Sequence, residues 1–122
     1  MVQVAVHAST VAVRRSGTAH AVVLAGASGS GKSSLALELM ALGAVLVSDD
    51  QTLLNAEEDA LIATAPPRLS GLIEWRGFGL LPAPCLPRAQ VVAWVDMDLR
   101  ATARMPEPDV KTVLGYSLPC LH

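Results

Sequence analysis

The sequence predicts an α/β fold that consists mostly of β sheet around one helix. Residues 21–25 form a short apolar run that suits a buried strand, and residues 33–40 repeat apolar side chains at helical spacing. A glycine-rich loop, residues 26–33, joins the two. Further short apolar runs, separated by turn residues, supply the other strands.

The segment before the loop is expected to be a β-hairpin. Residues 2–7 alternate in polarity, and residues 10–13 continue an extended pattern. Residues 14–18 carry two arginines, a serine, a glycine and a threonine, which are typical of a turn. The strand at 21–25 then leads directly into the glycine-rich loop.

The helix that begins at Ser33 is expected to end near Gly43, because glycine readily adopts the left-handed conformation that closes a helix. Residues 44–48 form the next strand, which closes at Asp49 and Asp50. Farther along we expect an acidic turn at 57–59, short strands at 61–65 and 72–76, and a central, continuously apolar strand at 90–96.

Composition indicates one compact domain over residues 1–122. Hydrophobic residues make up 52% of the chain and charged residues only 16%, which excludes a disordered tail. The two cysteines, Cys85 and Cys120, have no second cysteine or histidine at metal-binding spacing, so we expect free thiols.

Charge and hydropathy also limit the kinds of partner that the chain is expected to bind. A net charge of −2 provides no excess of positive charge that would attract nucleic acid or an anionic membrane. No apolar segment approaches the roughly 18 residues of a membrane-spanning helix, and no secretory signal is evident. We therefore expect a cytoplasmic protein that binds neither nucleic acid nor membrane.

The loop at residues 26–33 is a full match to the phosphate-binding pattern G-x-x-x-x-G-K-[ST]. Its glycines let backbone N–H groups converge on a phosphate, Lys32 reaches the β/γ oxygens, and the Ser33 hydroxyl is placed to bind Mg²⁺. A flexible linker would not be bracketed so closely by a strand and a helix. The sequence predicts that ATP with Mg²⁺ binds at Gly26, Ala27, Ser28, Gly29, Ser30, Gly31, Lys32, Ser33 and Ser34.

Asp49 and Asp50 end the strand after the loop helix, where an open α/β sheet places its ligand crevice. One carboxylate there can hold Mg²⁺ while another accepts a proton from an attacking hydroxyl. Such a pair is often only a solvated turn or a helix cap, but the phosphate loop one helix upstream favours a functional role. Because neighbours alternate along an extended chain, we expect only one of the two to face the nucleotide. The residues alone do not distinguish which.

Three other polar residues lie among apolar neighbours. His7 alone is typical of an ordinary surface side chain. Glu74 and Arg76 share one face of a predicted strand. They could form a plain ion pair, or a Mg²⁺ ligand beside a phosphate clamp.

Taken in order, these residues resemble the catalytic domain of bacterial HPr kinase/phosphorylase. The chain looks like the short forms of α-proteobacteria, which lack the family's N-terminal domain. The resemblance covers about residues 5–80 and is carried by residues 7–13, 26–39, 46–50 and 72–80, with a thinner match at 104–107 and 114–119. It implies a P-loop kinase architecture related to phosphoenolpyruvate carboxykinase.

The resemblance also implies an activity. The chain would be an ATP-dependent serine kinase with a regulatory role, acting on HPr, the phosphocarrier of the sugar phosphotransferase system, or on a related carrier. Because the family forms hexamers, we expect a homo-oligomer. Two alternatives stay open: a P-loop kinase or NTPase acting on a small molecule, and a nucleotide-binding sensor without catalysis.

Each matching residue takes a role from the family. Lys32 would neutralise the β/γ-phosphates, Ser33 and Glu74 would hold Mg²⁺, and Arg76 would stabilise charge on the transferred group. The proton-handling roles go to the remaining residues: Asp50 as the base, Asp49 as its support and His7 beside the carboxylate or phosphate.

The chain also departs from the family. The turn at residues 14–20 is a few residues longer than usual. Family members continue beyond the position of His122 into a segment with a further catalytic arginine and a C-terminal helix. Because the reverse, phosphorylase reaction depends on that segment, we do not expect phosphorylase activity.

Overall fold

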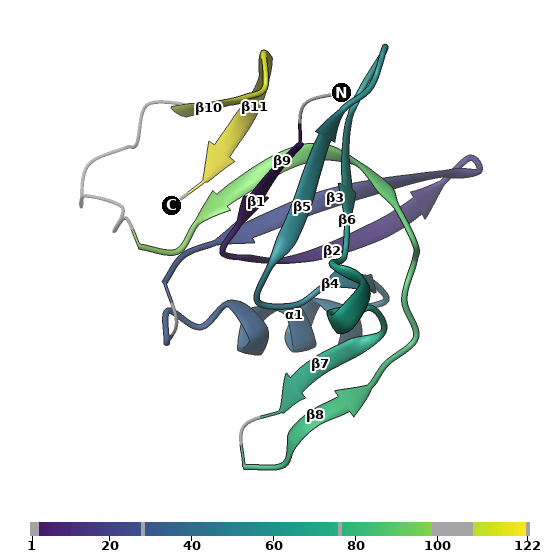
Figure 1. The fold of residues 1–122 in the computed structure, drawn as a ribbon, viewed down its shortest axis with the longest axis vertical. Coiled ribbons are helices and arrows are strands. Elements are labelled where there is room, and N and C mark those ends of the chain that lie inside the picture. The colour runs from purple at the N-terminus through teal and green to yellow at the C-terminus, as the bar shows by residue number, and fades with distance from the viewer. Residues whose placement is uncertain (1–2, 28, 76, 99–108, 122) are drawn as a thin grey trace.

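The computed structural model describes residues 3–27, 29–75, 77–98 and 109–121. Within these residues the chain forms strands around a single α-helix, as predicted (Figure 1). In chain order the elements are β1 (Gln3–Val6), β2 (Ala8–Arg15), β3 (Thr18–Ala25), α1 (Lys32–Ala41), β4 (Val45–Ser48), β5 (Thr52–Ala56), β6 (Leu61–Thr64), the short 3-10 helix Pro67–Leu69, β7 (Leu72–Trp75), β8 (Gly79–Pro82), β9 (Ala89–Asp96), β10 (Asp109–Val113) and β11 (Tyr116–Leu121).

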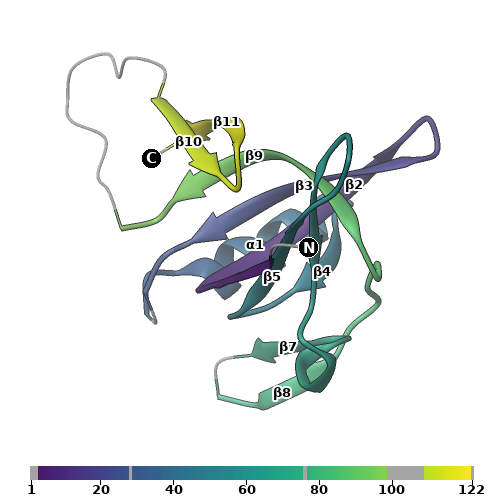
Figure 2. The ribbon, with the colours of Figure 1, turned by 45° about the horizontal axis from the view of Figure 1, so that its top comes forward.

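The main sheet has the strand order β1-β5-β6-β9-β3-β2-β4. Strand β9 lies at its centre, parallel to β3, which confirms the central strand predicted at 90–96. The β10–β11 hairpin joins the sheet where β11 pairs with the end of β9 (Figure 2). Strands β7 and β8 form a separate two-stranded sheet beside α1.

The predicted hairpin before the loop is confirmed. Strands β2 and β3 pair along their whole length, from Ala8 opposite Ala25 to Arg15 opposite Thr18. The first strand, β1, is not part of this hairpin, because it pairs with β5 instead. Strands β5, β8, β10 and β11 were not predicted from the sequence. All of them depend on partners that are not evident from the local pattern.

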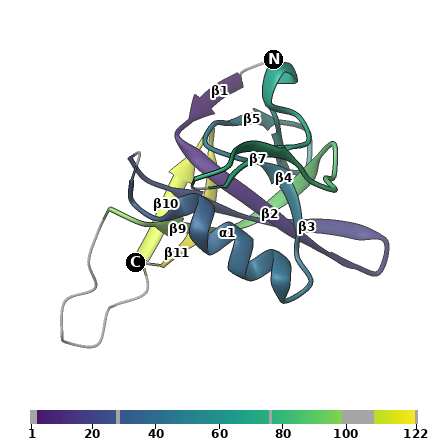
Figure 3. The same ribbon diagram turned by 90° about the horizontal axis from the view of Figure 1, so that it is seen from below.

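Helix α1 packs across one face of the sheet, mainly against β2 (Figure 3). The residues buried between the helix and the strands include Val11, Leu24, Ala36 and Leu46. The helix ends as predicted, since Gly43 takes a left-handed φ of 112° and its N–H donates to the Met40 carbonyl at 3.0 Å.

A larger apolar cluster covers the opposite face of the sheet. Along β3, Ala21 and Val23 point into this cluster, while Val22 and Leu24 point toward α1, as expected for a strand buried on both faces. Leu54 of β5 and Trp94 of β9 are almost fully buried there. Cys85 and Cys120 are free thiols, as expected.

The topology gathers four chain segments at one edge of the sheet. Strands β3 and β4 both run antiparallel to β2, so they run parallel to each other. Their carboxyl ends therefore meet at this edge, together with the end of β9 and the start of β2. The phosphate loop leaves β3 at this edge, and Asp49 follows β4 there.

Among the described residues, no helix has the length and apolar character needed to span a membrane.

Removing a side chain from the core tests this packing. Leu54→Ala is expected to lower the free energy of unfolding by about 2–5 kcal/mol, because it empties a fully buried position. Leu42→Ala, at a position 85% exposed after α1, is expected to change it by less than about 0.5 kcal/mol. Urea unfolding measures both, and equal losses would contradict the packing described.

Candidate functional site

The phosphate loop requires its glycines for two different reasons. At Gly26 the constraint is space, because a Cβ would lie 2.7 Å from Ser30 Oγ and 3.0 Å from Met97 Cβ. At Gly29 and Gly31 it is backbone conformation, since their φ values of 83° and 96° strain any other residue. Ser28 lies outside the described residues.

The N-terminus of α1 has the properties of an anion site. Its first-turn N–H groups have no partners within the helix, and no described side chain caps them. The first turn also holds no acidic residue. The buried Ser30 hydroxyl beside it has no hydrogen-bond partner within the described part of the chain. Free N–H groups together with the helix dipole favour a bound phosphate.

Lys32 is the buried cation of the loop, with 4% of its surface exposed. Its Nζ donates to the Ala27 carbonyl at 3.1 Å and lies 3.9 Å from Asp50 Oδ1. The ammonium group is thus held between the loop and Asp50.

Asp49 is buried and bonded on both of its carboxylate oxygens. Oδ1 accepts the Ser9 hydroxyl at 2.6 Å and the Ser33 hydroxyl at 2.7 Å, and Oδ2 accepts the Glu74 N–H at 2.8 Å. Ser9 belongs to β2, Ser33 to α1 and Glu74 to β7. A single carboxylate therefore joins three elements to the end of β4.

Asp50 has a different environment. Its side chain is 55% exposed, and its backbone takes a left-handed φ of 65°. Both aspartates lie beside residues of the phosphate loop, since Asp49 accepts the Ser33 hydroxyl and Asp50 lies 3.9 Å from Lys32, and the prediction that only one of them faces the nucleotide stays a prediction. The alternation of an extended strand does not apply here, because the chain leaves the extended conformation at Asp50.

Three further predicted residues are described by the structure, and all three lie next to the loop or to Asp49. His7 is exposed, and its carbonyl accepts the Gly26 N–H at 3.1 Å, next to the loop. Glu74 contributes its backbone to Asp49 and has an exposed side chain. Ser34 is exposed on the first turn of α1. Arg76 lies outside the described residues.

Two residues that sequence reasoning missed contact the site. Ser9 is fully buried, and its hydroxyl binds Asp49. The carboxylate of Asp98 accepts the Ala27 N–H at 3.1 and 3.2 Å. For Ser9 the available signal was weak: a polar residue beside Ala8 and Thr10 at the start of the predicted hairpin. For Asp98, the signal was its position just after the central strand, which ends beside the loop strand.

A metal at this site would need ligands besides protein carboxylates. The described residues include no group of three or more His, Cys, Asp and Glu side chains suited to a metal ion. Ser33 and Asp49 nevertheless supply a hydroxyl and a carboxylate in direct contact, and the Glu74 backbone is bonded to the same carboxylate. Mg²⁺ commonly binds through one or two carboxylates together with substrate phosphates, so the donor set fits that ion.

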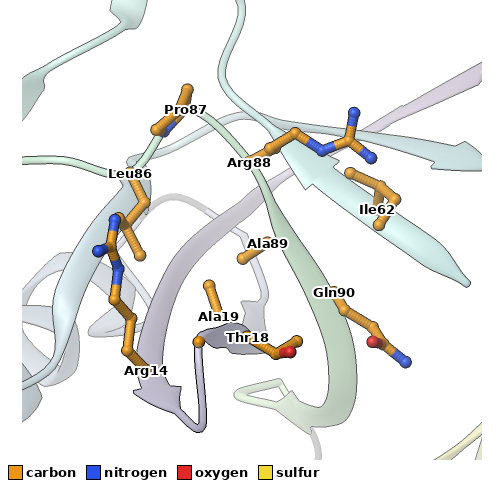
Figure 4. A pocket seen from close by; sticks show the side chains of 10 residues that line it. Arg14, Thr18, Ala19, Ile62, Leu86, Pro87, Arg88, Ala89 and Gln90 are labelled. Atoms are coloured by element: carbon orange, nitrogen blue, oxygen red, sulfur yellow. The ribbon is translucent and has the colours of Figure 1, made fainter.

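A cavity of about 450 Å³ lies far from this site, at the turn of the β2–β3 hairpin (Figure 4). Arg14, Thr18, Leu86 and Gln90 line it, together with Arg88, which forms an ion pair with Glu57 at 2.6 Å. The hairpin turn is at the opposite end of β3 from the phosphate loop, so this cavity is not part of the nucleotide site.

Comparison with known proteins identifies the family. The model of the HPr serine kinase C-terminal domain matches residues 1–86. The chain belongs to this family. The loop, the aspartate pair and Glu74 all lie within the matched residues, and the match confirms the resemblance found in the sequence.

Curated relatives agree with this assignment. HPr kinase/phosphorylase of Geobacillus thermodenitrificans is 37% identical over 86 residues, which cover 64% of this chain and 28% of the relative. HPr kinase/phosphorylase 1 of Oceanobacillus iheyensis is 46% identical over 61 residues, which cover 49% of this chain and 20% of the relative. The matched region thus spans less than a third of either relative.

The fold has a solved counterpart. The Hpr(Ser) kinase/phosphatase of Coxiella burnetii superimposes with a TM-score of 0.77 and 22% sequence identity, covering 96% of this chain and 76% of the other. This similarity confirms the predicted fold class, a mostly β P-loop kinase architecture with one loop helix.

The hydrogen bonds of Asp49 predict that replacing Asp49 or Asp50 by asparagine affects the free energy of unfolding unequally. Asp49→Asn is expected to lower the free energy of unfolding by about 1–3 kcal/mol, because its three donors lose a charged acceptor. Asp50→Asn is expected to lower it by less than about 0.5 kcal/mol, because its side chain is exposed and asparagine tolerates a left-handed backbone. Urea unfolding compares them, and similar losses would argue against the anchoring role of Asp49.

Proposed function

We propose that the protein is an ATP-dependent kinase that transfers the γ-phosphoryl group to a serine of HPr or of a related phosphocarrier. The observation that carries this proposal is the difference between the environments of Asp49 and Asp50. Asp49 is buried and bonded to Ser33, whereas Asp50 is exposed beside Lys32. Phosphoryl transfer needs both a fixed anchor for the metal-binding hydroxyl and an accessible base.

The nucleotide would bind through the loop and the N-terminus of α1. Backbone N–H groups would meet the phosphates, and Lys32 would move from the Ala27 carbonyl to the β/γ oxygens. The transition state of this reaction is loose and carries its charge on oxygens, so positioned cationic and N–H groups provide most of the catalysis.

Ser33 and Glu74 would hold Mg²⁺, which when bound neutralises phosphate charge. The Ser33 hydroxyl donates its hydrogen to Asp49, so its lone pairs stay available for a cation. Asp49 thereby orients a metal ligand. Glu74 is brought to the same place because its N–H is bonded to the other Asp49 oxygen.

Asp50 would be the base. As the acceptor serine oxygen bonds to the γ-phosphorus, the bond to the ADP oxygen breaks and the serine proton passes to the Asp50 carboxylate. The carboxylate is exposed, so it can reach a hydroxyl presented by a protein substrate. We assign His7 a place beside this carboxylate or the phosphate, and Arg76 the stabilisation of charge on the transferred group.

A regulatory role, a homo-oligomeric assembly and a cytoplasmic location complete the proposal. These three points follow from the resemblance to the family to which the chain belongs, and the name HPr kinase/phosphorylase of the curated relatives bears on the activity alone. That name includes both directions of the reaction, and the expectation that this chain lacks the phosphorylase direction stays a prediction.

A transfer assay tests the proposal. Purified protein with Mg²⁺ and γ-labelled ATP is expected to label HPr, and to leave HPr unlabelled when its acceptor serine is replaced by alanine. The readout is label on HPr after gel separation. ATP turnover without HPr would instead indicate a small-molecule kinase or NTPase, and ATP binding without any turnover would indicate a sensor.

The base assignment has its own test. Asp50→Asn is expected to lower kcat by about 10²–10⁴-fold, because the amide cannot take the serine proton, while the Kd for ATP changes by less than about threefold. Asp59→Asn, in the exposed turn between β5 and β6, serves as the control and should leave kcat unchanged. Unchanged transfer by Asp50→Asn would refute the assignment.

A further inference from the structure

We propose that Ser9 is a positioning residue that sets the two aspartates relative to each other and to the phosphate loop. This inference rests on the proposed function, since it assigns Ser9 to the same site. Ser9 lies on β2, is fully buried and is not one of the residues that match the phosphate-loop or aspartate motifs.

The Ser9 hydroxyl bonds to both aspartates. Its Oγ donates to Asp49 Oδ1 at 2.6 Å and accepts the Asp50 N–H at 3.3 Å. A serine hydroxyl has one hydrogen to donate and two lone pairs to accept with, so both bonds can exist together. One buried atom is thus shared by the side chain of the first aspartate and the backbone of the second.

The bond to Asp50 acts on a strained conformation. Asp50 has a φ of 65°, which residues other than glycine rarely adopt and which persists only where the surroundings hold it. Both of its backbone polar groups are bonded to the start of β2: its carbonyl accepts the Ala8 N–H at 3.1 Å, and its N–H donates to Ser9. Strand β2 therefore holds the backbone from which the Asp50 side chain projects.

The bond to Asp49 affects Ser33, one of the two proposed Mg²⁺ ligands. Asp49 Oδ1 accepts the hydroxyls of Ser9 and Ser33 together. Ser9 holds this oxygen from the side of β2, so that Ser33 can bond to it from α1. Without Ser9, Asp49 would lose one of its three partners, and the orientation of the Ser33 hydroxyl would be less restricted.

The next residue provides a matched control. Thr10 is also fully buried, and its hydroxyl lies 2.9 Å from that of Thr52, which in turn donates to the Ala8 carbonyl at 2.9 Å. Thr10→Val removes a buried hydroxyl of the same strand that bonds to Thr52 rather than to an aspartate. A loss caused only by damage to β2 would appear in both variants.

The experiment compares Ser9→Ala, Ser9→Thr and Thr10→Val in the complete chain, with Mg²⁺, ATP and HPr. Ser9→Ala is expected to lower kcat by about ten- to a hundredfold, because the catalytic groups lose their relative placement, with the KM for ATP within about threefold. Ser9→Thr keeps the hydroxyl and should restore kcat to within about threefold, and Thr10→Val should match the wild type within the same range. If Ser9→Ala does not fold, Ser9→Cys, which keeps the size but bonds weakly, takes its place.

A second readout does not depend on activity. Hydrogen exchange followed by NMR should show the Asp50 amide exchanging at least about tenfold faster in Ser9→Ala than in the wild type, and unchanged in Thr10→Val. Wild-type kcat in Ser9→Ala, an equal loss in Thr10→Val, or failure of Ser9→Thr to recover would overturn the inference. If the wild type itself transfers no phosphoryl group to HPr, the proposed function fails, and the Asp50 amide alone decides the role of Ser9.

Discussion

The candidate site depends on one buried carboxylate. Asp49 accepts hydrogen bonds from β2, from the first turn of α1 and from β7, so one charged group joins three elements to the end of β4. A buried carboxylate is costly unless its oxygens are satisfied, so the three donors are needed to keep it there. The same bonds place Ser33 and Glu74, the two proposed metal ligands, around a common point.

Sheet topology makes this contact possible. Because β3 and β4 run in the same direction beside β2, the phosphate loop and the aspartate pair emerge at one edge. The Met97–Asp98 segment after β9 closes the other side of the loop, where Asp98 bonds to Ala27 and Met97 lies against Gly26. The ends of neighbouring strands thus lead into the phosphate loop, into Asp98, which bonds to the loop, and into Asp50, the proposed base.

Much of this arrangement could be predicted from sequence, because its signals are local. The loop motif, the apolar strand before it and the helix after it lie in consecutive residues, and Asp49-Asp50 ends the next strand. The positions of Ser9 and Asp98 could not be predicted in this way, since each acts on a residue that is distant in the chain. The left-handed backbone at Asp50 was also hidden, because it depends on bonds to Ala8 and Ser9 rather than on the residue itself.

An experimental structure with Mg²⁺ and a non-hydrolysable ATP analogue would show whether Asp49 organises the site. We expect the metal at about 2.1 Å from Ser33 Oγ, Lys32 Nζ on the β/γ-phosphates, and Asp49 still bonded to Ser9, Ser33 and the Glu74 N–H. A triphosphate bound away from the loop, or a metal bound with Asp49 detached from Ser33, would contradict the claim that this carboxylate organises the site.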